Sequence, residues 1–192
     1  MIDQHLERYL GPIARGWAFA GEPSGVRICL FENRPHPGAA TYATLGLSRH
    51  VLAMPRERQV RQELLLAVGD PFASDDLASP LVYVAGRVVR EHRALLRGDV
   101  VSVGNPVSTT STCKHLYSSS PVVFPRGLAG CDGTQPTTVF VWLVPILDDE
   151  AALVRQHGWS HFERLLELVD PDLLDLERRS ITTATTARSP ST

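Results

Sequence analysis

Lysine is almost missing from this chain of 192 residues: Lys114 is the only one, and the other eighteen basic residues are arginines. Basic and acidic residues number 19 and 21, so the formal net charge at pH 7 is -2. A chain without excess positive charge lacks the electrostatic footprint of proteins that bind nucleic acid or anionic membranes. We attribute the arginine bias to GC-rich coding DNA and expect neither nucleic acid nor membrane as a partner.

Cysteine and long hydrophobic runs are also scarce. The three cysteines, Cys29, Cys113 and Cys131, are an odd number without a framework spacing, which argues against a disulfide scaffold and favours reduced thiols. No stretch reaches the roughly 18 apolar residues of a membrane-spanning helix, and the first residues do not form a signal peptide. We therefore expect a cytoplasmic protein.

The motifs of the common enzyme classes are missing as well. The sequence contains no G-x-S-x-G elbow, no P-loop and no G-x-G-x-x-G after a strand. Cys113 and His115 with the distant Cys131 do not match the ligand spacing of zinc sites. The acidic run at 148–150 is typical of a helix start, where carboxylates complement the helix dipole. We expect no metal, no cofactor and no catalytic residue.

One catalytic alternative stays open. The segment 108–135 contains Cys113, His115 and many serines, and a Cys–His or Ser–His pair needs only to be close in space. A small hydrolase or transferase would require these side chains to converge with a carboxylate such as Asp132 around a pocket. On a regular strand Cys113 and His115 would lie about 7 Å apart, too far for a direct hydrogen bond.

Helical and strand patterns alternate along the chain, which predicts an α+β fold, a mixed β-sheet flanked by helices. Helices are expected over 2–10 and 80–97, with two more after residue 148. The segment 59–68 suits a strand or a helix equally well. Strands are expected over 26–31, 41–47, 99–103, 113–117, 122–124 and 138–147.

Capping residues and turn formers predict several helix ends. Ser79 is expected to cap the helix over 80–97, and Gly98 to follow its last residue. Ser160 and Glu163 have the spacing of a capping box, and Asp170-Pro171 is expected to restart a short helix. Residues 1–181 are predicted to form one domain. Residues 182–192 contain no core formers and are expected to be a disordered tail.

The middle of the chain is rich in proline. Pro106, Pro121 and Pro125 cannot donate to a sheet ladder, so the segments predicted over 113–117 and 122–124 are expected to be edge strands or loop arms. An exposed ladder edge within 105–125 would be able to accept a peptide from a partner as an added strand.

Short motifs in a fixed order give the chain a resemblance to the Suppressor of fused (SUFU) domain family, in its bacterial single-domain form. The resemblance covers roughly residues 25–181. It is carried by Thr44-Leu45-Gly46-Leu47-Ser48, Glu63-Leu64, Leu96-Arg97-Gly98-Asp99-Val100, His115-Leu116-Tyr117, Val122-Val123-Phe124-Pro125, Leu143-Val144-Pro145-Ile146, Glu150, Gly158 and Leu176-Glu177-Arg178-Arg179-Ser180.

The resemblance implies an α+β domain that binds proteins, without catalytic activity or an obligatory cofactor. The larger animal relatives sequester a zinc-finger transcription factor, whose peptide is captured as an added strand. The bacterial single-domain relatives resemble immunity proteins, which bind and neutralise a toxin. We expect a protein partner, with a cognate toxin as the sharpest form of this hypothesis. A regulatory or structural subunit of a larger complex is a further alternative.

Three side chains are candidates for the contact with a partner. Tyr117, Arg126 and Trp159 belong to the residue types that dominate binding energy at interfaces. Trp159 is expected in the turn between two helices, with its indole half-exposed. If the three are hot spots, their alanine variants should each weaken binding by more than about 1–2 kcal/mol.

Overall fold

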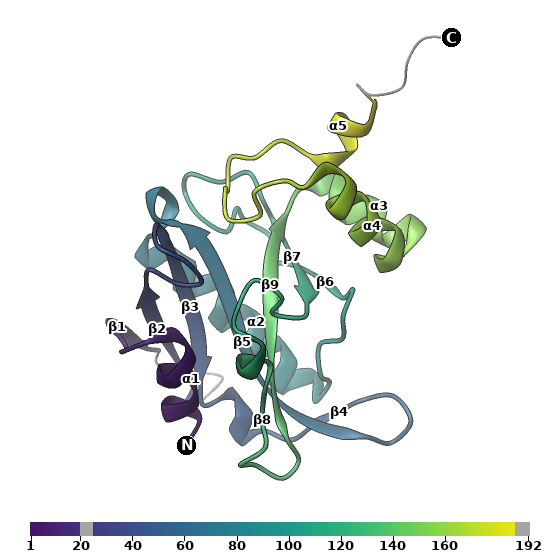
Figure 1. Cartoon of the computed structure of the whole chain (residues 1–192). Helices are drawn as coiled ribbons and strands as arrows, with labels where there is room; N and C mark the ends of the chain where they lie inside the picture. The colour runs from purple at the N-terminus through teal and green to yellow at the C-terminus, as the bar shows by residue number, and fades with distance from the viewer. Residues whose placement is uncertain (20–24, 187–192) are drawn as a thin grey trace.

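A single mixed β-sheet forms the centre of the computed structural model, which describes residues 1–19 and 25–186 (Figure 1). The strand order is β1-β2-β3-β5-β9-β7-β6, with β4 beside β5 and β8 beside β9. The strands are β1 (Arg15–Ala18), β2 (Arg27–Glu32), β3 (Ala39–Leu45), β4 (Leu52–Ala53), β5 (Gln59–Gly69), β6 (Val100–Ser102), β7 (His115–Ser119), β8 (Gly130–Cys131) and β9 (Thr138–Ile146). The central strands β5 and β9 run parallel, whereas the other named pairs are antiparallel.

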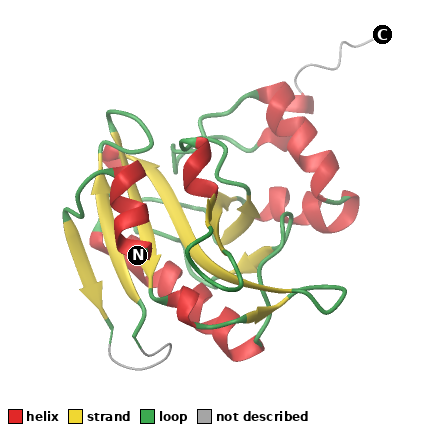
Figure 2. Cartoon of the chain, turned by 60° about the horizontal axis from the view of Figure 1, so that its bottom comes forward, coloured by secondary structure: helices red, strands yellow, loops and turns green. Residues whose placement is uncertain are grey.

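Helices cover both faces of this sheet (Figures 1 and 2). They are α1 (Ile2–Leu10), α2 (Ala78–Glu91), α3 (Asp148–His157), α4 (Trp159–Val169) and the short α5 (Ile181–Thr186). The buried side chains of α2 pack against one face, and those of α1, α3 and α4 pack against the other. The predicted α+β fold with a mixed sheet flanked by helices is confirmed. Within the described ranges, no helix has both the length and the apolar character needed to cross a membrane.

The ambiguous segment 59–68 is strand β5, and its position explains the ambiguity. Leu64 and Leu66 belong to the core cluster under α2, whereas Leu65 and Ala67 belong to the cluster on the opposite face. A strand that is covered on both faces has consecutive apolar residues in place of a strict alternation. The local pattern therefore did not distinguish a strand from a helix.

The helix predicted over 80–97 is shorter than expected and has different ends. It begins at Ala78, and Ser79 is not its N-cap; it ends at Glu91, followed by His92 in the left-handed region. Beyond the helix, the N–H of Ala53 donates to the C=O of His92, and the C=O of Ala53 accepts from the N–H of Ala94. The side chain of Gln62 bonds both the N–H and the C=O of Leu95. These partners take up backbone groups that a longer helix would use itself.

The prediction of an exposed ladder edge within 105–125 is wrong. Residues 122–124 form a turn and not a strand. Strand β7 pairs with β9 on one side and with β6 on the other, so it is an interior strand. The free edges of the sheet are β1 and β6.

Two predictions near the C-terminus are also wrong. Helix α4 begins at Trp159, and Ser160 and Glu163 do not form its capping box, because Glu163 binds other side chains. Residues 171–177 form turns in place of a restarted helix, with Asp172 accepting from the N–H of Leu174. The predicted domain boundary falls at the first residue of α5, and residues 187–192 of the predicted tail lie outside the described residues.

Two buried carboxylates hold the ends of the sheet in place. Glu63 accepts hydrogen bonds from the Thr44 hydroxyl and from the backbone N–H groups of Gly46 and Ser48. At the other end, Glu150 forms a buried, bidentate ion pair with Arg178, with N–O distances of 2.6 and 2.7 Å. All six residues belong to the motifs that carry the family resemblance, so these parts of the motifs are structural.

Candidate functional site

Two of the three candidate partner-contacting residues lie at one place in the structure. Tyr117, on β7, is buried and donates a hydrogen bond of 2.8 Å from its hydroxyl to Glu163 on α4. Trp159 begins α4, and 42% of its surface is exposed, as expected. The guanidinium of Arg97 lies 4.7 Å from the centroid of the Trp159 ring and forms an ion pair with Glu163. Arg97 therefore joins the two candidates through Glu163.

The third candidate lies elsewhere. Arg126 begins a short 3₁₀ helix, Arg126–Ala129, which packs against α1 and β9. Among the described residues, Arg126 makes no hydrogen bond, ion pair or ring contact with Tyr117 or Trp159. The structure thus brings together Tyr117 and Trp159 and leaves Arg126 apart.

A tight turn after α2 places Arg97 in this cluster. Gly98 has a φ of +93°, and its N–H donates to the C=O of Ser118 on β7. A Cβ at Gly98 would lie 2.5 Å from Cβ of Trp159. Glycine is required at this position both for the backbone conformation and for the approach of the tryptophan.

The buried part of the cluster fixes the exposed part. Burial and the hydrogen bond to Glu163 raise the pKa of Tyr117 far above its ordinary value, so its hydroxyl remains a donor even at alkaline pH. The Tyr117 ring meets Phe162 edge to face at a centroid distance of 4.9 Å. Glu163 therefore binds the buried hydroxyl of Tyr117 and the more exposed guanidinium of Arg97, and Arg97 also contacts the Trp159 ring.

A cavity of about 290 Å³ lies beside this cluster and is lined by residues of α4, β7 and β9. The rings of Tyr117 and Trp142 line it together with aliphatic side chains from α4 and from two turns. The buried Nε1 of Trp142 has no hydrogen-bond partner among the described residues. The complete lining is Arg97, Tyr117, Ser119, Val122, Trp142, Val144, Glu163, Leu166, Glu167, Asp170, Pro171 and Leu173.

Exposed apolar side chains occur on the same elements. Val122 and Val123 are 74% and 42% exposed on the turn after β7, and Leu168 on α4 is 61% exposed. Single exposed apolar residues are common, and of these three only Val122 lines the cavity. We call the cluster, the cavity and Val122 the α4 face.

Among the described residues, Cys113, His115 and Asp132 do not converge as the catalytic alternative requires. Cys113 is buried, and burial raises the pKa of its thiol, which opposes formation of a nucleophilic thiolate. Nε2 of His115 lies 2.9 Å from Oδ1 of Asp148. Asp132 follows Cys131 of β8, which pairs with Thr138 at one end of β9. His115 pairs with Ile146 at the other end of β9. That separation is eight residues along β9, about 26 Å.

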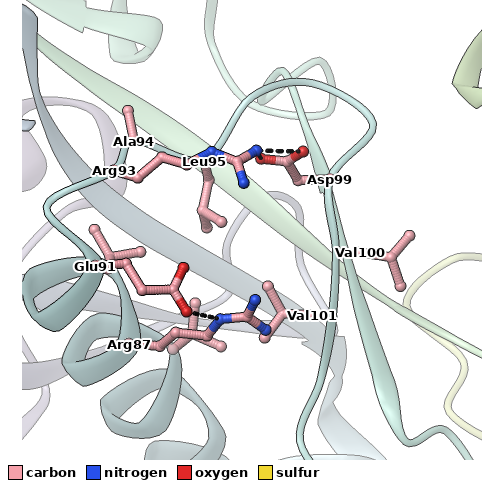
Figure 3. Close-up of a pocket in the computed structure, with 10 residues that line it drawn as sticks. Arg87, Glu91, Arg93, Ala94, Leu95, Asp99, Val100 and Val101 are labelled. Carbon is pink, nitrogen blue, oxygen red and sulfur yellow. Dashed lines mark hydrogen bonds and ion pairs between the residues drawn. The ribbon is translucent and has the colours of Figure 1, made fainter. Parts of the chain in front are cut away.

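A metal site and a small cavity were two other possibilities among the described residues, and both are less suitable. No group of three or more His, Cys, Asp or Glu side chains in this part of the chain is arranged to hold a metal ion. A second cavity, between α2 and β6, has a volume of only about 80 Å³ (Figure 3). Its charged side chains already form the pairs Arg87–Glu91 and Arg93–Asp99 (Figure 3).

Arg97 and Glu163 were not recognised as site residues from the sequence. They are 66 residues apart, and each had a local interpretation, as a helix side chain and as a capping-box partner. Only the pairing of β7 with β9 and the packing of α4 bring them together. No sequence signal would have identified the pair.

Comparisons with known proteins agree on one family. The family model described as Suppressor of fused protein (SUFU) matches residues 22–179. Immunity protein YqcF of Bacillus subtilis (strain 168) is 24% identical over 177 residues, covering 85% of this chain and 91% of that protein. A SUFU homologue from Neisseria gonorrhoeae FA 1090 has a similar structure, with a TM-score of 0.77 at 19% identity and 94% of each chain covered.

Two further solved structures share the fold. A chain of the Sufu–Fu complex gives a TM-score of 0.73 at 15% identity, covering 97% of this chain and 93% of that one. Drosophila Suppressor of Fused gives 0.64 at 16% identity, covering 84% of this chain but only 44% of that one. The chain thus corresponds to less than half of the Drosophila protein.

Proposed function

This chain belongs to the Suppressor of fused family, and we propose that it is a non-catalytic, protein-binding domain of the bacterial immunity type, which binds and neutralises a toxin. The relative named as an immunity protein is covered over 91% of its length, which supports a role for the single domain by itself. The complex in which a similar chain was solved supports a protein as the partner.

The observation that carries the proposal is the exposed aromatic side chain on the α4 face, which Arg97 contacts. Trp159 presents 42% of its surface, while Arg97, paired with Glu163, covers the ring. Tryptophan and arginine are enriched among the residues that dominate interface energies. A ring that is already held in place loses less side-chain entropy when a partner binds.

The three candidate residues have different proposed roles. Trp159 makes the direct contact. Tyr117 is buried, so we assign it a positioning role through Glu163. Arg126 is exposed on the 3₁₀ helix beside α1, and we propose it as a second contact away from the α4 face.

A growth-rescue experiment tests the proposal. The candidate toxins are the products of the genes beside the one that encodes this chain, each expressed in a host with or without the chain. Wild-type chain should restore growth against one of them, and Trp159→Ala should restore it less at equal protein level. If the chain restores growth against none of these products and forms a stable complex with a non-toxic protein, a role as a regulatory or structural subunit would be favoured.

The proposed setting is the cytoplasm. All three cysteines are free and buried in the described structure, and none pairs with another. Reduced thiols are the usual state in that compartment.

A further inference from the structure

The charge of this chain is unevenly distributed. Between Asp148 and Arg179 there are nine acidic and four basic residues, although the whole chain carries a formal net charge of only -2. This segment contains α3, α4 and the turns that follow them. Of these residues, Glu163, Glu167 and Asp170 line the cavity of the α4 face, and Arg97 is the one cationic residue in the same lining. The lining therefore has an excess of negative charge, which attracts a basic partner during encounter.

The cavity on this face combines apolar walls with an acidic mouth. Val122, Leu166 and Leu173 supply aliphatic walls. Glu167 and Asp170 are exposed and line the same cavity. Neither carboxylate forms an ion pair with any residue in the described parts of the chain. Glu163 differs from them because Arg97 already neutralises it.

These features distinguish between possible occupants. A purely apolar side chain would cover two carboxylates without compensating their charge, which is unfavourable. An acidic side chain would be repelled. Lysine and arginine have an aliphatic stem that packs on apolar surface and a charged head that remains near carboxylates.

We infer that the cavity of the α4 face receives a lysine or arginine side chain of the protein partner, with its stem against Leu166 and its charged head between Glu167 and Asp170. The inference rests on the proposed function, because it takes the α4 face as the binding surface. It adds the chemistry of the partner: a basic surface with one protruding cationic side chain.

The tryptophans provide a direct readout that does not require the natural partner. Trp142 lines the cavity, and Trp159 adjoins it beside Arg97. Trp17 lies on the distant edge strand β1, stacked on Tyr42 at 6.0 Å. Each indole N–H gives its own signal in a proton–nitrogen NMR spectrum, so binding at the cavity should shift two signals and leave that of Trp17 in place.

The probe is a capped Gly-Arg-Gly tripeptide, titrated to about 20 mM because contacts of one side chain are expected to give Kd values near millimolar. The same peptide with citrulline in place of arginine is the neutral control. Glu167→Gln and Asp170→Asn should each weaken binding about twofold to fivefold, the range of partly exposed ion pairs. Asparagine at position 170 also tolerates the left-handed conformation there.

A matched control separates local from overall charge. Glu177→Gln removes an exposed carboxylate of the same acidic segment outside the cavity, and it should leave the Kd unchanged within twofold. Absence of shifts at Trp142 and Trp159, equal binding of the citrulline peptide, or equal weakening by Glu177→Gln would each overturn the inference. Growth rescue in the same case would retain the proposed function and place the partner's contacts elsewhere.

Discussion

Cβ of Trp159 lies 2.5 Å from the position that a Cβ of residue 98 would occupy. This close approach lets the turn after α2 lie against α4, and it brings the guanidinium of Arg97 to 4.7 Å from the indole centroid. The exposed aromatic side chain of the α4 face is thus positioned by a backbone contact. The position of Trp159 therefore depends on the absence of a side chain at residue 98.

Gly98→Ala should therefore destabilise the protein. The methyl group would add a steric conflict of about 1–3 kcal/mol to the cost of a positive φ, about 1–2 kcal/mol. Gly104→Ala is the matched control, because Gly104 has a φ of +81° with open space around it. Urea unfolding of both variants should show the larger loss for Gly98→Ala. Equal losses would show that the Trp159 contact carries no energy.

The buried ion pair should contribute far more to stability than an exposed one. Arg178→Met leaves Glu150 buried without its charge partner, which costs about 3–5 kcal/mol. Arg15→Met removes an ion pair with Asp75 whose side chains are 59% and 66% exposed, and such pairs contribute at most about 1 kcal/mol. The comparison is made by denaturant unfolding at neutral pH. A similar, small loss for both variants would contradict the structural role of Arg178.

The stability of the protein should fall at alkaline pH, partly because of Tyr117. Its pKa is raised by burial and by Glu163, so the folded state keeps the proton when the unfolded state loses it near pH 10. Stability is then lost as the pH rises above about 10, by up to about 1.4 kcal/mol per pH unit for this group. Tyr117→Phe should have a correspondingly shallower slope between pH 10 and pH 11.5 in unfolding experiments. An unchanged slope would contradict the buried position of the phenol.

The sequence predicted the parts of the fold that local pattern determines. The strand expected over 138–147 is β9, and the helix expected over 2–10 is α1. The helix over 80–97 was predicted too long because the groups that end it, Ala53 and Gln62, come from distant strands. Helix propensity and capping residues contain no information about such partners.

The candidate site was predictable only in its exposed part. A tryptophan in a turn between helices indicated a half-exposed aromatic side chain, and Trp159 has that position. The burial of Tyr117 and the separate location of Arg126 follow from the strand order, in which β7 lies inside the sheet. The proline pattern wrongly suggested an edge: Pro121 and Pro125 lie after β7, so they do not prevent β7 from pairing on both sides.

The affinity of the Trp159→Ala variant for the toxin identified by growth rescue tests the central claim most directly. Titration calorimetry should show at least about tenfold weaker binding, equivalent to about 1.4 kcal/mol, because an aromatic anchor is lost. Tyr83→Ala, which removes a 48% exposed aromatic side chain from α2 on the other face of the sheet, should bind like the wild-type chain. Equal affinities of the wild-type and Trp159→Ala chains would contradict binding through the α4 face.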